Sequence, residues 1–244
     1  MTALPTKRDE TWRYSDLEAV ARVWPVATHA HVVPAGETLA LPILLDAADD
    51  AVTIEDHEIE IGASAQAIVH VAITSGRLGR VFVKVRLAEG AHFELTGAIV
   101  GGGSDTHEIV TRVTHAEPNA TSAQTVRIVL GGQATGSYLG KVAVARDAQK
   151  TDATQSAKAM LLARTATANL KPELEIYADD VKCAHGATVG ELDAQALFYL
   201  AARGIPPAEA KALLLRAFVG GLFEGTPDET RFDAAIDAAL EKML

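Results

Sequence analysis

Residues Pro172–Gly190 read PELEIYADDVKCAHGATVG and mark the point where the character of the chain changes. Before this stretch the sequence is typical of short strands, and after it the composition is typical of helices. The stretch contains the single cysteine of the chain, Cys183, followed two residues later by His185. Apolar residues stand between polar neighbours in its first half, which predicts an extended segment with one buried face.

The pair Cys183 and His185 is the candidate for chemistry. In a strand, residues two apart share a face, so both side chains would project to the same side. A thiolate and an imidazole together can bind iron, zinc or copper, but two ligands are too few for a closed structural site. Further ligands would have to come from elsewhere, for example from a second chain. Alternatively, Cys183 is a small buried residue and His185 a hydrogen-bonded polar one. Four acids precede the pair: Glu173, Glu175, Asp179 and Asp180.

Upstream, residues 32–163 are predicted to form strands. Val81–Leu87 (VFVKVRL) alternates strictly, with Val81, Val83, Val85 and Leu87 on one face. Turn residues separate such runs and no helical period interrupts them, which argues against a doubly wound α/β sheet. A sandwich, a barrel and a β-helix all remain compatible with this pattern. The predicted runs are Ala67–Ile73, Val81–Leu87, His92–Val100, His107–His115, Thr125–Leu130 and Tyr138–Ala145.

After Gly190 three helices are predicted, over Asp193–Arg203, over Pro207–Phe223 and after a capping box that starts at Thr226. The second is apolar on more than one side, so part should pack on neighbours and part could face a partner. A three-helix cap over the open end of a β-helix and a docking surface are both compatible with this pattern. The expected organisation is a short N-terminal segment (1–31), a core (32–190) and a C-terminal helical subdomain (191–244).

The N-terminal segment should carry a short helix between Leu17 and Trp24, with Ser15 as its N-cap. Seven histidines are scattered through the segment and the core without metal-binding spacing. We interpret them as solvated or locally hydrogen-bonded. They are His29, His31, His57, His70, His92, His107 and His115.

Composition excludes several classes of function. A net charge of -10 argues against binding to nucleic acid or to an anionic membrane surface. One cysteine leaves no internal disulfide framework and fits a cytoplasmic protein. Neither a signal peptide nor an 18-residue apolar span is expected. Gly101–Gly103 lacks the following Lys-Ser/Thr of a phosphate loop, and no G-x-S-x-G motif is present, so neither ATP hydrolysis by that route nor a hydrolase triad is predicted.

Two segments resemble the SufB/SufD family of scaffold proteins in the SUF iron–sulfur cluster assembly system. They are LEIYADDVKCAHGATVG with the following LDAQALFYLAARGI, and GKVAVARDAQKTDATQSAKAMLLA at Gly140–Ala163. WRYSDL at Trp12–Leu17 resembles the family's N-terminal motif, and with only eleven residues before Trp12 we expect a short form that lacks most of the helical region preceding this motif in the family. A single cysteine is more similar to the SufD branch than to the cysteine-richer SufB branch.

The resemblance implies a mainly β chain, with a right-handed parallel β-helix core and a C-terminal helical subdomain. It implies a scaffold, not an enzyme, with no catalytic residues of its own, that pairs with a SufB-like subunit or, alternatively, with itself. It also implies a SufC-like ABC ATPase as partner. An iron–sulfur cluster would form transiently at the subunit interface, with His185 as the preferred ligand and Cys183 beside it as a metal or thiol contact. The ATPase would bind the helical region, through Phe198, Leu200, Leu214, Leu215, Phe218 and Leu222. The alternative is a dimerisation and ATPase-docking module that binds no metal.

Overall fold

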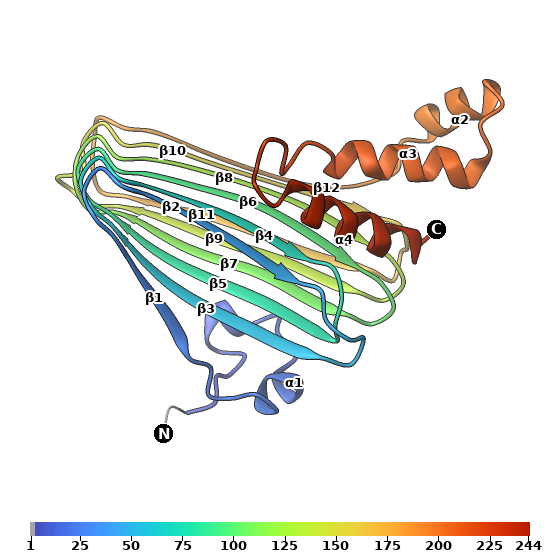
Figure 1. The fold of residues 1–244 in the computed structure, drawn as a ribbon, viewed down its shortest axis with the longest axis horizontal. Coiled ribbons are helices and arrows are strands. Elements are labelled where there is room, and N and C mark those ends of the chain that lie inside the picture. Colours follow the sequence, from blue (N-terminus) through green and yellow to red (C-terminus); the bar gives the residue numbers. More distant parts are fainter. Residues whose placement is uncertain (1–2) are drawn as a thin grey trace.

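The computed structural model describes residues 3–244, and its body consists of two six-stranded parallel sheets stacked as the walls of a β-solenoid (Figure 1). One wall, the odd sheet, has the order β1-β3-β5-β7-β9-β11, and the other, the even sheet, has the order β12-β10-β8-β6-β4-β2. The odd strands are β1 (Thr28–Val33), β3 (Val52–Ile61), β5 (Leu78–Leu87), β7 (Thr106–His115), β9 (Thr135–Val144) and β11 (Thr167–Ile176). The even strands are β2 (Thr38–Leu45), β4 (Gln66–Ile73), β6 (His92–Gly101), β8 (Thr121–Leu130), β10 (Asp152–Leu161) and β12 (Lys182–Glu191).

Each coil of the solenoid contributes one strand to each wall. Neighbouring strands in a wall are one coil apart, as in the pairing of Gln66 with His92 and of Thr135 with Thr167. This architecture confirms the expected β-helix core and removes the sandwich and barrel alternatives. Each of the six predicted runs corresponds to one observed strand. The core begins with β1 at Thr28, slightly before the expected start at residue 32.

Strict alternation in the strands separates the inside of the solenoid from its outer faces. On β5, Val81, Val83, Val85 and Leu87 are buried in the interior. Lys84 lies on the outer face, where it forms an ion pair at 2.6 Å with its register neighbour on β3. Burial of aliphatic side chains contributes about 1.5–3 kcal/mol each, which makes the repeated inward Val, Leu and Ile the main stabilising contribution.

The C-terminal helices α3 (Pro207–Val219) and α4 (Glu229–Glu241) pack on the outer face of the even sheet. Phe223 and Phe232 stack on each other with ring centroids 4.4 Å apart, both lie edge-on to His70 on β4, and they share a buried cluster with outward sheet residues such as Ala98. The helices therefore do not cap the open end of the solenoid, which corrects that alternative (Figure 1). Small side chains on the outer face allow this close approach. Helix α2 (Ala194–Ala202) extends away from the sheet and contains no buried residue.

Two predicted helix caps are wrong. Asp16, not Ser15, caps α1 (Leu17–Ala21), because its carboxylate accepts from the amides of Glu18 and Ala19. Asp228, not Thr226, occupies the N-cap of α4, and no side chain there makes a capping hydrogen bond.

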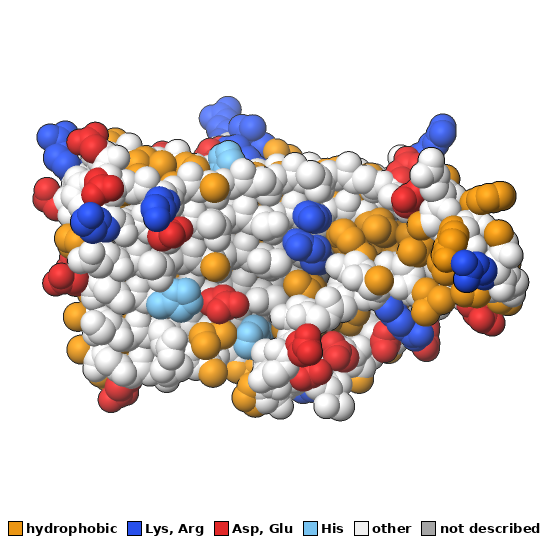
Figure 2. All heavy atoms as spheres, turned by 90° about the horizontal axis from the view of Figure 1, so that it is seen from above, with side chains coloured by type: hydrophobic (Ala, Val, Ile, Leu, Met, Phe, Trp, Pro, Cys, Tyr) orange, Lys and Arg blue, Asp and Glu red, His pale blue; other side chains and the backbone are white. Residues whose placement is uncertain are grey.

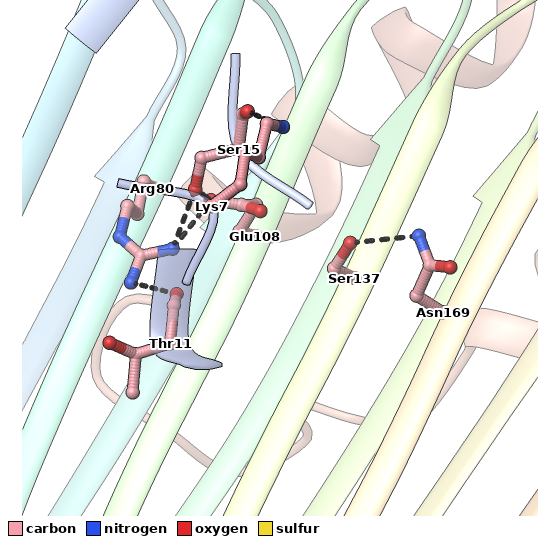
Figure 3. Close-up of polar contacts among 7 residues, drawn as sticks. All are labelled: Lys7, Thr11, Ser15, Arg80, Glu108, Ser137 and Asn169. Carbon is pink, nitrogen blue, oxygen red and sulfur yellow. Dashed lines mark hydrogen bonds and ion pairs between the residues drawn. The ribbon is translucent and has the colours of Figure 1, made fainter. Parts of the chain in front are cut away.

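Ser15 instead joins a buried polar cluster that holds the N-terminal segment on the outer face of the odd sheet (Figure 3). Its hydroxyl donates to Glu108 on β7 at 2.5 Å, and Arg80 on β5 forms an ion pair with the same carboxylate at 2.5 Å. Arg80 also donates to the carbonyl of Thr11 at 2.7 Å and lies 3.8 Å from the ring centroid of Trp12. The segment that includes the 3₁₀ turn η1 (Glu10–Trp12) is thus anchored by contacts remote in sequence. Across residues 3–244, no helix is long and apolar enough to cross a membrane.

Candidate functional site

Cys183 and His185 lie on β12, the last strand of the even sheet, whose only partner among the described strands is β10. β11 is likewise the last strand of the odd sheet. The free edges of these two strands form an open end of the solenoid, here called the C-terminal mouth. On β12 every side chain except the half-buried Cys183 is exposed. The predicted candidate pair therefore sits at an uncovered edge of the molecule.

Both side chains occupy inward positions on β12. Cys183 pairs with Ala153 and His185 pairs with Gln155, and both of these β10 residues are buried in the interior. Cys183 packs against the interior cluster, and because successive strand residues alternate, His185 shares that face. The pair thus forms part of the last layer of the solenoid interior, which opens at the C-terminal mouth.

The thiol of Cys183 has a raised pKa. Burial is the main cause, the negative charge of Asp152 adds to it, and a backbone hydrogen bond with Ala153 opposes it. The thiol is therefore mostly protonated at neutral pH, and a metal ion would have to displace its proton to bind. Among residues 3–244, no group of three or more His, Cys, Asp and Glu side chains is arranged to hold a metal ion. The C-terminal mouth therefore provides two candidate metal ligands, Cys183 and His185, and any further ligands would have to come from outside this part of the chain.

Three of the four acids that precede the pair form ion pairs elsewhere. Glu173 and Glu175 lie on β11 and form ion pairs with Lys171 at 3.2 Å and with Lys141 at 2.6 Å. Asp180 pairs with Lys150 at 3.1 Å in the loop before β12. These three carboxylates form ion pairs on the outer face or in a loop. None of the three is a neighbour of Cys183 or His185.

A buried chain of polar side chains, here called the interior polar column, lies beneath His185 and was not predicted. It consists of Thr111, Gln124, Tyr138 and Gln155. Thr111 donates to the side-chain amide oxygen Oε1 of Gln124 at 2.6 Å, and the hydroxyl of Tyr138 lies 3.2 Å from the same Oε1 and 3.3 Å from Gln155 Oε1. Gln155 reaches the last coil by donating to the carbonyl of Glu173 at 3.4 Å.

Gly140 makes room for this column. A Cβ at this position would lie 2.2 Å from the hydroxyl oxygen of Tyr138. Burial raises the pKa of Tyr138, so its hydroxyl stays protonated and available as a donor. The only local signal in the sequence is the pair of glutamines at inward positions of strands, which is unusual because amides need partners when buried.

The histidines are less exposed than expected. His57, His70, His107 and His115 are buried. The expectation of local hydrogen bonding holds for three of them: His107 contacts the carbonyl of Gly76 at 3.0 Å, His115 contacts the hydroxyl of Ser122 at 2.9 Å, and His57 contacts Glu55 at 3.0 Å. Burial lowers the pKa of His115 to about 4, so this imidazole is neutral at physiological pH.

The helical docking residues predicted from the sequence divide into two groups. Leu215 is fully buried against the even sheet, and Phe218 and Leu222 pack against the same cluster. Leu200 and Leu214 are half-buried. Phe198 on α2 is 76% exposed, which is the highest exposure among the large hydrophobic residues of the C-terminal helices.

Two further large side chains within the predicted docking segments Phe198–Gly204 and Pro207–Phe223, not among the six named docking residues, are exposed. Tyr199 on α2 is 56% exposed and Leu213 on α3 is 49% exposed. The guanidinium of Arg203 lies 4.8 Å from the ring centroid of Tyr199. Figure 2 shows hydrophobic side chains gathered over the C-terminal helices on this face of the molecule. The group Phe198, Tyr199 and Leu213 is here called the α2 patch.

Comparison with known proteins gives the family. Residues 28–218 match the family model described as "SUF system FeS cluster assembly, SufBD core domain". The chain is 30% identical over 174 residues to the iron-sulfur cluster assembly protein SufD of Escherichia coli, covering 71% of this chain and 41% of that protein. It is 39% identical over 124 residues to the SufBD family protein slr0076 of Synechocystis, covering 51% of this chain and 27% of that protein. It is 36% identical over 166 residues to the chloroplastic protein ABCI7 of Arabidopsis thaliana, covering 66% and 34%.

The matched region contains the whole solenoid together with α2 and nearly all of α3. The chain spans less than half of the length of each of these three relatives. The family model nevertheless covers most of the chain, and two of these relatives are named as SufD or SufBD family proteins. This is sufficient to assign the chain to a family. The chain therefore belongs to the SufBD core family of SUF-system iron–sulfur cluster assembly proteins.

Proposed function

We propose that this chain is a SufD-like scaffold subunit that pairs with a SufB-like subunit through the C-terminal mouth. The observation that carries the proposal is the position of Cys183 and His185 on a free, exposed edge strand. Unpaired strand edges present N–H and C=O groups that favour pairing with another chain. A partner strand placed there would cover the last layer of the interior and bring its own side chains next to the pair.

The cluster is the cargo of this assembly and would be built between the two subunits. Fe–S clusters are held by thiolates, with imidazole replacing them at some irons, and four ligands are usual. This chain supplies one thiol and one imidazole at the mouth, so the SufB-like partner would supply the remainder. His185 is the preferred ligand because it is exposed, whereas Cys183 is half-buried and its thiol has a raised pKa.

An ABC-type ATPase of the SufC kind would dock on the α2 patch. Phe198 and Tyr199 expose apolar area on α2, which contains no buried residue, and Leu213 does so on α3, whose other face packs on the even sheet. Aromatic residues with an adjacent arginine, here Arg203, are typical of the centres of protein interfaces. ATP hydrolysis would belong to that partner, and the whole assembly would be cytoplasmic.

A second candidate function is a dimerisation and ATPase-docking module that binds no metal. The half-buried Cys183 thiol favours it, because its raised pKa keeps it protonated and metals bind the thiolate. It predicts the same partners and the same mouth contact, but no iron that depends on His185. The two candidates therefore separate on metal content and not on assembly.

The test is co-expression with the cognate SufB-like and ABC ATPase subunits, followed by size-exclusion chromatography with mass determination. Val189→Asp places a charge on the inward side of the β12 edge and should abolish pairing with the SufB-like subunit. Val32→Asp is the matched control, since Val32 is 78% exposed on β1 at the opposite end. Phe198→Asp should release only the ATPase. A chain that elutes alone, or a Val189→Asp variant that still assembles, would contradict the pairing.

A further inference from the structure

Three histidines and a glutamate meet at the other open end of the solenoid, formed by the free edges of β1 and β2 and here called the N-terminal mouth. His29 and His31 come from β1, and Glu55 and His57 come from β3. His29 and His57 are register partners. On β3 the two residues have the same parity as Ile59, which is fully buried in the interior, so Glu55 and His57 point inward.

The imidazoles of His29 and His31 both pack against the imidazole of His57. The ring of His29 stacks on that of His57 with centroids 5.1 Å apart, and the ring of His31 with centroids 5.4 Å apart. His31 Nε2 lies 3.2 Å from His57 Nδ1, and His57 Nε2 lies 3.0 Å from Glu55 Oε2. Both ring nitrogens of His57 therefore face a partner within the cluster.

The carboxylate decides which nitrogen of His57 carries the proton. A neutral imidazole has one N–H and one lone pair. Glu55 accepts from Nε2, so the lone pair of His57 is at Nδ1 and points toward His31 Nε2. A carboxylate that orients an imidazole from its far nitrogen is the outer-shell arrangement typical of metal-bound histidines.

The separation of the two facing nitrogens suits a shared cation. Two imidazole nitrogens bound tetrahedrally to Zn²⁺, each at 2.0–2.1 Å, lie roughly 3.3 Å apart. The observed 3.2 Å between His31 Nε2 and His57 Nδ1, which form a hydrogen bond in the metal-free chain, is close to that edge. His29, in register with His57 and exposed at the mouth, is the nearest third imidazole.

We propose that His31 and His57 are the first two ligands of a site for a divalent first-row transition cation, with Zn²⁺ as its best fit. Glu55 orients His57, and His29 becomes the third ligand by turning its ring toward the cation. No three such side chains in residues 3–244 are already arranged around a common point. The metal-free structure therefore presents two of the ligand nitrogens, and the site is completed when the cation binds and His29 turns. The remaining position is open to water or to a partner.

This site is independent of the proposed function. β1 and β11 are separated by five strand spacings in the odd sheet, about 24 Å, so the N-terminal and C-terminal mouths cannot share an ion. It uses imidazole and not thiolate, which favours zinc, nickel, copper or cobalt over an iron–sulfur cluster.

The test is a titration of the metal-free, untagged chain with Co²⁺, followed by visible absorption, and then displacement by Zn²⁺. We expect one saturable Co²⁺ per chain that Zn²⁺ displaces. His31→Ala should abolish this binding, as should His57→Gln, which retains a polar side chain. Glu55→Gln should weaken it about 10–100-fold, because the outer-shell carboxylate is lost.

His92→Ala and His185→Ala are the matched controls and should bind Co²⁺ as the wild type does. His31→Ala alters an edge position, and its thermal unfolding midpoint confirms that it is folded. The absence of saturable binding in the wild type would overturn the proposal, as would equal binding in His31→Ala and His57→Gln. A His31→Ala variant that is destabilised while the wild type binds no cation would mean a structural hydrogen bond only, and would also overturn it.

Discussion

His185 on the edge strand β12 is the register partner of Gln155 on β10. The exposed imidazole at the C-terminal mouth therefore lies next to the end of the interior polar column. Gln155 is buried and linked through Tyr138 to Gln124. The strand that carries the proposed cluster ligands therefore lies next to a layer in which the side-chain oxygens of Gln124 and Gln155 share the hydroxyl of Tyr138.

Gly140→Ala should destabilise the chain by about 1–3 kcal/mol, because the new methyl group would overlap the hydroxyl of Tyr138. Urea unfolding measures the change. Gly186→Ala on β12 is the matched control, since nothing lies within 4 Å of a Cβ there and the cost should be close to zero. Equal effects of the two substitutions would mean that the column is not tightly packed.

Glu108→Ala should cost about 3–5 kcal/mol of the free energy of unfolding, because it leaves the buried guanidinium of Arg80 without its carboxylate. Glu58→Ala removes an exposed ion pair with Lys84 and should cost less than about 1 kcal/mol. Urea denaturation of the two variants provides the comparison. If the two costs are the same, the anchor of the N-terminal segment is not the buried pair.

Stability should fall as the pH is lowered from about 6.5 to about 4. Burial depresses the pKa of His115 to about 4 in the folded chain, whereas an unfolded histidine has a pKa near 6.5. The unfolded state thus binds more protons in this window, and protonation favours unfolding, by up to about 3 kcal/mol at its lower end.

His115→Gln removes this contribution while keeping a hydrogen-bonding side chain toward Ser122. We expect its free energy of unfolding, measured in urea at several pH values, to fall less steeply with acidification than that of the wild type. Burial also lowers the pKa of His107 and His70, so part of the slope should remain. Identical slopes in the two proteins would show that His115 is not the residue responsible.

Cys183 should react more slowly with iodoacetamide at pH 7.5 than the same thiol in the urea-unfolded chain, because thiolate is the nucleophile and the raised pKa lowers the thiolate fraction. Mass spectrometry of the labelled chain over time measures the rate. In complex with the SufB-like subunit, labelling should be slower again. Unchanged labelling in that complex would place the partner away from the C-terminal mouth.

Much of the fold could be predicted from local patterns. Val81, Val83 and Val85 alternate with charged or larger residues, and this period of two predicts which faces are inside without knowledge of the partner strands. The β-helix itself came from the family motifs around Cys183, since alternation alone also fits a sandwich. The apolar helix over Pro207–Phe223 was expected to pack partly on neighbours, and Leu215 does so.

What could not be predicted depends on contacts between residues far apart in the sequence. Ser15 looked like a helix cap because its local context is that of a capping box, but its partner Glu108 is 93 residues away. The cluster of His31, His57 and Glu55 requires the register of β1 on β3, and the proximity of Gln155 to His185 requires that of β10 on β12. The spacing of residues within a single segment does not predict which residues of two strands are paired.

The most direct test of the central claim is the iron and acid-labile sulfide content of the co-expressed complex with the SufB-like and ABC ATPase subunits, purified without oxygen. The account predicts that wild type and the His31→Ala variant carry iron and sulfide, and that His185→Ala assembles normally but loses most of both. Equal iron and sulfide in His185→Ala and wild type would contradict a cluster site at the C-terminal mouth. That result would leave a docking and dimerisation module as the function of the chain.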